Sequence, residues 1–261
     1  MIYLTHDGMI SSNNLEVGTK ILSCADDGTS TWETVTAMIS RPSNGSGLEL
    51  PDLGLTVRTG HSLVSYADGA LTPVFVEQLG AGSFPVMTSP LPPVDDREAP
   101  TVGDEVLYRT GERIRAALNG DLEVGHGRWM WEQIAPIPVQ ADLFSLSRRQ
   151  LFRIISGLMA QDMSTMPSLL MCNQYIEVAS LLRHLLTPHG WTVDIRLVPY
   201  AGAFYGAAAI SAAHTASVGH GAVETRTVDA LDSTSYPVTE SGRYFAFSPT
   251  SSVLYQSVPL T

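Results

Sequence analysis

The sequence predicts a mostly β protein whose strands are interrupted by a helical insertion. The first ninety residues alternate short β-branched stretches with turn signals such as Asp26-Asp27-Gly28 and Asp68-Gly69. Apolar residues at helical spacing follow between residues 104 and 190. From about residue 225 to residue 261 the pattern returns to that of strands. These three observations predict β, then α, then β.

This order indicates one discontinuous β-domain rather than three separate domains. We assign residues 1–90 and 225–261 to the β-domain and residues 100–224 to the insertion. A proline-rich stretch at 89–100 separates the two parts, as expected for a linker or a surface strap. If the two ends form one domain, the strand around Phe245–Phe247 should lie near a strand of the first half.

Helical periodicity is clearest in the middle of the chain. One predicted amphipathic helix carries apolar residues at i, i+3, i+4 and i+7, namely Leu151, Ile154, Ile155, Leu158 and Met159. A second helix begins near residue 174 and should end at Pro188 and Gly190. A strand is expected at 192–198. The Ala- and Gly-rich stretch at 200–221 has no assignment from its pattern.

Composition limits the functional classes. The 261-residue chain has 15 basic and 26 acidic side chains, a formal net charge of −11, which repels phosphate and argues against nucleic acid as a partner. Cys24 and Cys172 lie far apart, and no spacing of Cys and His is typical of a metal site. No apolar run is long enough to span a membrane, and the first residues do not resemble a secretory signal. We expect no cofactor, no metal and synthesis in the cytoplasm without secretion.

Several stretches resemble a known family when they are taken together. "YLTHDGMISSNNLEVGTKILSCADDGTSTWETV" and "LTVRTGHSLVSYADGALTPVFVEQLGAGSFPVMT" resemble the N-terminal half of a Hint domain, the fold of inteins and hedgehog autoprocessing modules. Leu15 to Ile21 matches the family pattern L-x-x-G-D-x-V, Trp32 to Val35 matches W-x-x-V, and His61 ends a block similar to T-x-x-H. The last residues, from "YPVTESGRYFAF" onward, resemble the closing Hint strands. The resemblance implies a Hint-type β-domain.

The insertion resembles the LAGLIDADG-type endonuclease region that interrupts many inteins. Residues Ile155 to Met163 overlay that nonapeptide and keep its Gly, its Leu and its final acid, Asp162. The resemblance implies a small α/β endonuclease remnant, in which Asp162 and Asp121 could hold a divalent metal over a phosphate. Met163 replaces the terminal Gly of the motif, Ala116 stands where the first helix would have Gly, and the chain is acidic. We therefore expect two helices packed through small residues rather than an active nuclease.

Protein splicing requires reactive groups that this chain lacks in the expected places. The family uses a Cys or Ser at the first intein residue, a His that activates the preceding bond and a terminal His-Asn pair. Here the chain opens with Met1-Ile2-Tyr3, has Arg58 three residues before His61, and stops at Thr261. We expect no splicing and no catalytic residue, so that His61 is a hydrogen-bonded residue at a strand end.

The expected role is that of a non-splicing intein-like protein used as a structural or interaction component. Because inteins are common in phage genomes, the resemblance implies a phage virion and, as partners, other structural subunits of that particle. Two alternatives remain: a metal-dependent homing-type DNA endonuclease, and a free cytoplasmic regulatory binding module. Residues that could contact a partner are Trp129, Met130, Trp131, Phe245 and Phe247.

Overall fold

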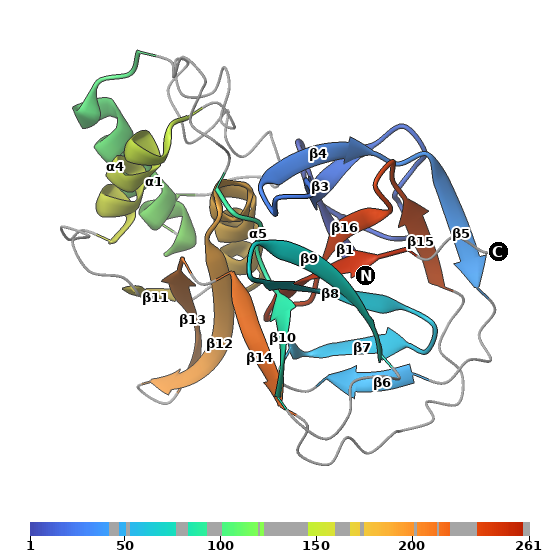
Figure 1. Ribbon diagram of the computed structural model, residues 1–261. Coiled ribbons are helices and arrows are strands. Elements are labelled where there is room, and N and C mark those ends of the chain that lie inside the picture. The colour runs from blue at the N-terminus through green and yellow to red at the C-terminus, as the bar shows by residue number, and fades with distance from the viewer. Residues whose placement is uncertain are drawn as a thin grey trace. The chain divides into compact units, whose positions relative to one another are not determined.

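The computed structural model shows a mostly β protein that divides into two compact units (Figure 1). The first unit comprises residues 1–92 and 213–261, and the second comprises 93–212. The structure describes residues 1–41, 47–50, 53–76, 83–92, 101–119, 121–122, 146–159, 168–172, 175–200, 203–212, 214–219 and 234–257. Among these, no helix is long and apolar enough to cross a membrane.

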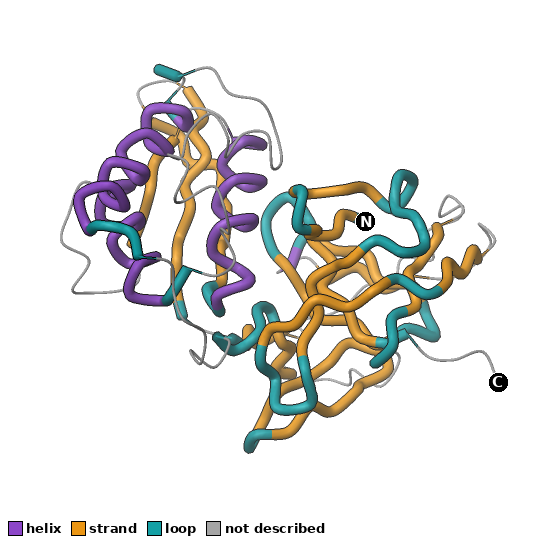
Figure 2. The backbone as a smooth tube through the Cα atoms, turned by 90° about the horizontal axis from the view of Figure 1, so that it is seen from above, coloured by secondary structure: helices purple, strands orange, loops and turns teal. Residues whose placement is uncertain are grey.

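A curled antiparallel sheet forms the centre of the first unit, and its strands come from both ends of the chain (Figure 2). The order is β4-β3-β1-β16-β17-β8-β9, with β2 paired to β1. The strands are β1 (Ile2–Thr5), β2 (Gly8–Ser11), β3 (Lys20–Cys24), β4 (Ser30–Thr34), β8 (Ser62–Ala67), β9 (Ala70–Phe75), β16 (Arg243–Phe247) and β17 (Ser252–Gln256). Ile2 lies opposite Phe247, which confirms the expected pairing of the 245–247 strand with a strand of the first half.

Smaller strand pairs complete this unit. They are β5 (Ala37–Arg41) with β15 (Thr234–Val238), β6 (Gly47–Leu50) with β7 (Leu55–Arg58), and β10 (Ser83–Met87) with β14 (Thr215–Gly219), all antiparallel. The sequence placed residues up to 224 in the insertion. Because β14 pairs with β10 along its whole length, residues 215–219 belong to the first unit instead.

Both faces of the central sheet are buried. Successive residues of a strand point to opposite faces, so each face is covered by a different set of residues. One core cluster includes Tyr3, Ile21, Leu63, Tyr244, Ala246, Val253 and Tyr255. The neighbouring positions Leu4, Leu22, Cys24, Val64, Phe245, Phe247 and Leu254 belong to another core cluster. Each inner strand is therefore apolar on both faces, and its sequence does not alternate between apolar and polar residues.

The second unit mixes helices with a sheet, so it is not a purely helical insertion. Its helices are α1 (Asp104–Leu118), α4 (Arg148–Met159) and α5 (Tyr175–Leu186), and its antiparallel sheet has the order β11 (Ser168–Cys172), β13 (Ala203–Ser211), β12 (Thr192–Tyr200). After α5, a 3₁₀ turn containing Pro188 ends at Gly190 in the left-handed conformation (φ 85°), as predicted. The Ala- and Gly-rich stretch that had no assignment supplies β13 and β14.

Glycines permit a very close crossing of α1 and α4. A Cβ atom on Gly157 would overlap the carbonyl oxygen of Tyr108, and a Cβ atom on Gly111 would overlap the carbonyl oxygen of Ile154. Leu107, Ile114, Leu151, Ile154 and Leu158 are buried around this crossing and belong to the core of the second unit. The expected packing of two helices through small residues is thus present, with Gly111 rather than Ala116 as the partner of Gly157.

Candidate functional site

His61, the residue that the sequence singled out, contacts one of several buried tyrosines of the first unit, Tyr236. We define the tyrosine–histidine cluster as Tyr3, His61, Tyr236, Tyr244 and Tyr255. The sheet order β1-β16-β17-β8 brings four of these residues together, because His61 directly precedes β8 and the three strands carry Tyr3, Tyr244 and Tyr255. Tyr236 comes from β15. All five side chains are at most 5% exposed.

Ring contacts connect the cluster. Tyr244 and Tyr255 lie directly opposite each other on β16 and β17, with nearly parallel rings whose centroids are 5.7 Å apart. Tyr3 meets Tyr244 edge to face at 5.7 Å. The ring of His61 lies 4.2 Å from that of Tyr236. Aromatic pairs of this kind stabilise a sheet beyond the burial of their area, so the cluster has the geometry of a packed core.

The backbone holds His61 at the end of a tight turn. Gly60 adopts a positive φ of 83°, which a glycine accommodates without strain. The amide of His61 donates to the carbonyl oxygen of Arg58 at 3.2 Å, and the amide of Val76 donates to the carbonyl oxygen of His61 at 3.1 Å. Arg58, three residues before His61, is itself buried. His61 is therefore a strand-end residue fixed on both sides.

Burial keeps the phenol groups of Tyr3 and Tyr255 neutral. It raises the pKa of Tyr3 far above its ordinary value, and the neighbouring Tyr236 raises it further. The pKa of Tyr255 is raised in the same way, first by burial and then by Tyr3 and Tyr236. The Tyr3 hydroxyl donates to the Met1 sulfur at 3.6 Å, whereas the buried Tyr255 hydroxyl has no hydrogen-bond partner in the part of the chain that the structure describes. A neutral phenol is a weak nucleophile.

The Cys24 thiol does not belong to this cluster. Cys24 lies in the core cluster on the opposite face of the sheet from Tyr3 and Tyr255. Burial raises the pKa of the thiol to about 12, although Arg243 opposes the shift. The thiolate is the reactive form of cysteine, so Cys24 is inert near neutral pH.

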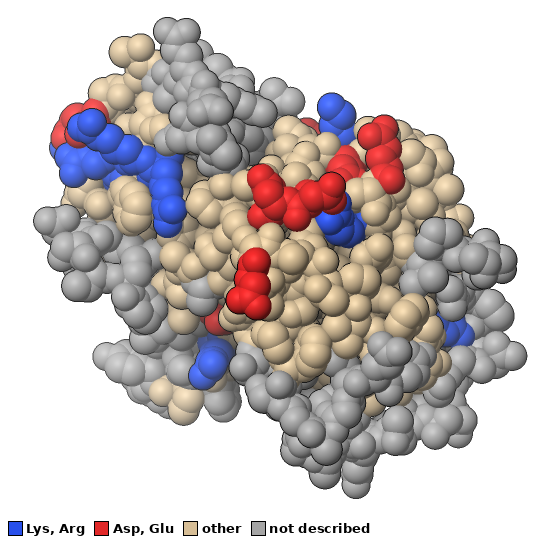
Figure 3. Space-filling view, in the orientation of Figure 1, with Lys and Arg blue, Asp and Glu red and all other residues tan. Residues whose placement is uncertain are grey.

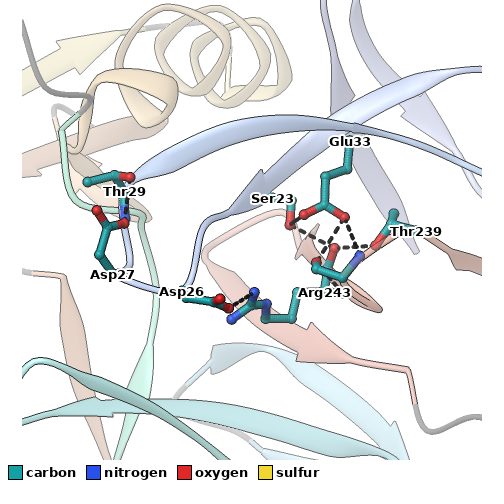
Figure 4. Close-up of polar contacts among 8 residues, drawn as sticks. Ser23, Asp26, Asp27, Thr29, Glu33, Thr239 and Arg243 are labelled. Atoms are coloured by element: carbon teal, nitrogen blue, oxygen red, sulfur yellow. Dashed lines mark hydrogen bonds and ion pairs between the residues drawn. The ribbon is translucent and has the colours of Figure 1, made fainter.

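A polar network ties the two segments of the first unit together (Figure 4). Both carboxylate oxygens of Glu33 on β4 accept hydrogen bonds: one from the Ser23 hydroxyl at 3.2 Å, the other from the Ser241 amide at 3.0 Å and the Ser241 hydroxyl at 2.8 Å. The Ser23 hydroxyl lies 2.8 Å from the carbonyl oxygen of Arg243 as well, and the Arg243 guanidinium pairs with Asp26. The network joins the β3–β4 hairpin to the start of β16, and we interpret it as structural.

The remaining predicted residues do not form a site in the described part of the chain. Asp121 is exposed just beyond α1, where its amide donates to the carbonyl oxygen of Ala116 at 2.8 Å. Its expected counterpart, Asp162, lies outside the described residues, and so do the predicted contact residues Trp129, Met130 and Trp131. No group of three or more His, Cys, Asp or Glu side chains among the described residues could hold a metal ion.

Phe245 and Phe247 are not surface residues. Their side chains are 0% and 1% exposed in the core of the first unit. Both were predicted as partner contacts because aromatic side chains carry much of the binding energy of tight interfaces. Since β16 lies between β1 and β17 and is covered on both faces, these two side chains offer no surface to a partner.

Basic side chains gather on two helices of the second unit (Figure 3). The arginines concerned are Arg109, Arg113 and Arg115 on α1 and Arg148, Arg149 and Arg153 on α4. Part of this charge is compensated locally, since Arg109 contacts Glu105 at 2.9 Å and Glu112 at 3.0 Å, and Arg153 contacts Asp104 at 3.3 Å. These pairs are largely exposed and contribute little to stability.

The tyrosines of the cluster were missed by sequence reasoning. Tyr244 and Ala246, and likewise Val253 and Tyr255, have the two-residue spacing that puts side chains on one face of a strand. That signal gives the face of each strand but not which strands are neighbours.

Comparison of the sequence with protein-family models and with curated proteins gives no match.

Proposed function

We propose that the chain is a non-splicing intein-like protein that serves as a structural or interaction component of a larger protein assembly, in particular a phage virion. The observation that carries this proposal is the tyrosine–histidine cluster: a buried aromatic core occupies the region where the Hint resemblance implies a reactive centre.

The resemblance implies that reactive groups come from the first strand, from the block around His61 and from the closing strands. In this chain β1, the turn before β8 and β17 contribute Tyr3, His61 and Tyr255 to one cluster. Acyl transfer begins with attack by a hydroxyl or thiolate that a neighbouring base or a lowered pKa has activated. The pKa values of Tyr3 and Tyr255 are shifted in the opposite direction, which supports a non-splicing centre.

The surroundings of His61 support the same conclusion. A general base must lie within hydrogen-bond reach of the proton that it removes. The His61 side chain is 5% exposed and packs its ring against Tyr236. A substrate carbonyl could approach the imidazole only if the aromatic core opened, so a structural role for this histidine fits the geometry better.

Features of the surface favour an interaction role. Only 16% of the residues are charged, and large apolar side chains are exposed, including Val17 at 61% and Leu197 at 56%. Exposed apolar side chains that stand alone are common on monomers. Leu197, however, lies on β12, whose outer edge pairs with no strand of the described residues. Such edges are frequent sites of association between chains.

Intact-mass measurement tests the absence of splicing chemistry. The purified chain is incubated with dithiothreitol, which cleaves thioester intermediates, or with hydroxylamine, which cleaves both thioesters and esters. We expect a single species of unchanged mass in the wild type and in the His61→Gln variant. Cleavage in the wild type that is lost in His61→Gln would establish an acyl-transfer centre and overturn the proposal.

Particle composition tests the structural role. We expect mass spectrometry of purified virions from the encoding phage to find the chain at a fixed ratio to the other structural proteins. A chain that is abundant in infected cells and absent from washed particles would instead favour the free regulatory module.

A further inference from the structure

Strand β12 is a long strand at the edge of its sheet, as far as the described residues show. All nine of its residues, from Thr192 to Tyr200, pair with β13 in an antiparallel ladder. The sheet order β11-β13-β12 puts β12 at the end, and no strand among the described residues pairs with its other side. An open edge of this length presents a row of backbone donors and acceptors.

The position of Pro199 indicates which backbone groups point outward. Pro199 lies opposite Phe204 in the ladder, and proline has no amide proton to donate. Proline is tolerated in an edge strand where its nitrogen faces away from the neighbouring strand. Because the outward direction alternates along a strand, the amide and carbonyl groups of Val193, Ile195 and Leu197 also face the open edge.

Side chains of β12 are self-complementary around Ile195. Val193 and Ile195 are 1% exposed on the core face, whereas Leu197, two residues further on the same face, is 56% exposed. On the other face Asp194 and Arg196 carry opposite charges, and Arg196 is exposed. Charges of opposite sign two residues apart would lie directly opposite each other in an antiparallel pair centred between them.

We propose that β12 pairs with β12 of a second copy of this chain in an antiparallel ladder, with the two-fold axis at Ile195. Asp194 then lies opposite the partner's Arg196, and the exposed Leu197 lies beside the partner's Val193 on the core face. The two sheets become one continuous sheet across the axis. This inference deepens the proposed function and rests on it in one respect, because it names a copy of the chain as one of the partners.

Charge selects this register over its neighbours. An axis at Asp194 would oppose the two copies of that carboxylate, and an axis at Arg196 would oppose the two guanidinium groups. Like charges directly opposite each other in a ladder are destabilising. An axis between two residues would put residues whose amides face the partner opposite residues whose amides face away from it. The two strands could then not form the regular antiparallel hydrogen bonds. The axis at Ile195 also puts Pro199 beyond the last paired residue, since Thr192 lies opposite the partner's Val198.

Sedimentation velocity with charge variants tests the pairing. We expect the wild type to dimerise, the Arg196→Asp variant to raise the dimer Kd about tenfold or more by opposing two pairs of like charges, and Asp194→Arg combined with Arg196→Asp to restore most of the affinity. The matched control is Lys20→Asp, a charge reversal at an exposed position of β3, which should leave the Kd unchanged. Circular dichroism of each variant checks that the fold is retained.

Cysteine cross-linking gives a readout that does not depend on the charges. In the proposed register, residues 194 and 196 of different copies form a non-hydrogen-bonded pair, whose Cα atoms are about 4.5 Å apart and within disulfide reach. We expect a covalent dimer when Asp194→Cys and Arg196→Cys chains are mixed and oxidised, and none from either variant alone or from the wild type.

A monomeric wild type, a dimer insensitive to Arg196→Asp, or equal cross-linking in every sample would each overturn the inference. If a monomeric chain is nevertheless found at fixed stoichiometry in particles, the proposed function stands and only this surface is excluded.

Discussion

Gly111 and Gly157 pack reciprocally: each glycine lies against the carbonyl oxygen of the residue three positions before the other, Ile154 and Tyr108 respectively. The two helix backbones are in direct contact at this point, with no room for a methyl group on either side. This crossing fixes the spacing of α1 and α4 and therefore the shape of the core around Ile114 and Leu158.

The first prediction is that Gly157→Ala destabilises the second unit. Alanine is the better helix former, so propensity alone would favour the variant. Overlap of its Cβ with the Tyr108 carbonyl should dominate and cost about 1–3 kcal/mol in the free energy of unfolding, as overpacking of a core does. Denaturant titration followed by circular dichroism measures the change.

Gly103→Ala is the matched control for that prediction. Gly103 is the N-cap of α1 with a φ of −67°, and a Cβ atom there would meet no atom within 4 Å. Because alanine is a poorer N-cap than glycine, we expect a cost of up to about 1 kcal/mol, below that of Gly157→Ala. Equal effects of the two substitutions would show that the helix crossing is not tight in solution.

Local patterns in the sequence predicted much of this unit, and non-local features escaped them. The spacing of Leu151, Ile154 and Leu158 predicted α4. Pro188 and Gly190 predicted where the helical segment that begins with α5 ends. Both signals depend only on neighbours along the chain. The long strand β13 was missed, since its Ala- and Gly-rich sequence has little strand propensity and is held by β11 and β12 on either side.

The surroundings of the candidate site also depend on non-local contacts that local sequence patterns do not predict. His61 was recognisable from its block, but its surroundings depend on the order β1-β16-β17-β8, which joins strands from opposite ends of the chain. Phe245 and Phe247 were predicted as partner contacts because aromatic residues are frequent in interfaces. In β16 both faces are buried, which depends on the neighbouring strands, so neither side chain reaches the surface.

The second prediction concerns Glu33. Its carboxylate accepts hydrogen bonds from Ser23 and from both the amide and the hydroxyl of Ser241. In Glu33→Gln an amide NH₂ would replace one acceptor oxygen and face at least one of these donors. We expect a loss of about 1–3 kcal/mol in the free energy of unfolding, since hydrogen bonds to charged groups are among the strong ones.

Asp26→Asn provides the comparison for Glu33. Asp26 pairs with Arg243, but its side chain is 97% exposed. Water screens such a pair, and the substitution should leave the unfolding transition unchanged within error. If Asp26→Asn were as costly as Glu33→Gln, the network of Figure 4 would depend on the ion pair rather than on the partly buried hydrogen bonds of Glu33.

The third prediction is that Tyr255→Phe does not destabilise the protein. The Tyr255 hydroxyl is buried without a hydrogen-bond partner among the described residues, and an unsatisfied buried hydroxyl costs free energy that the phenylalanine ring does not. We expect equal or higher stability by up to about 1 kcal/mol near neutral pH. Tyr3→Phe, which removes the contact with the Met1 sulfur, should show no such gain. A clear loss in Tyr255→Phe would show that this hydroxyl has a bound partner, such as water or a ligand.

The last prediction follows from the Cys24 thiol, whose pKa burial raises from 9.0 to about 12. Because the folded pKa lies above the unfolded one, the protonated thiol contributes its full stability below about pH 9. That contribution is lost as the pH rises from 9 toward 12, by about 1.4 kcal/mol per pH unit. The stability difference between the wild type and Cys24→Ala should therefore shrink between pH 8 and pH 10 under reducing conditions, as measured by denaturant titration. Val64→Ala, a truncation in the same core cluster, should have a cost that does not depend on pH. A Cys24→Ala difference that stays constant over this range would mean that the thiol ionises in the folded protein as readily as in the unfolded chain, and Cys24 would then have to be reconsidered as a reactive residue.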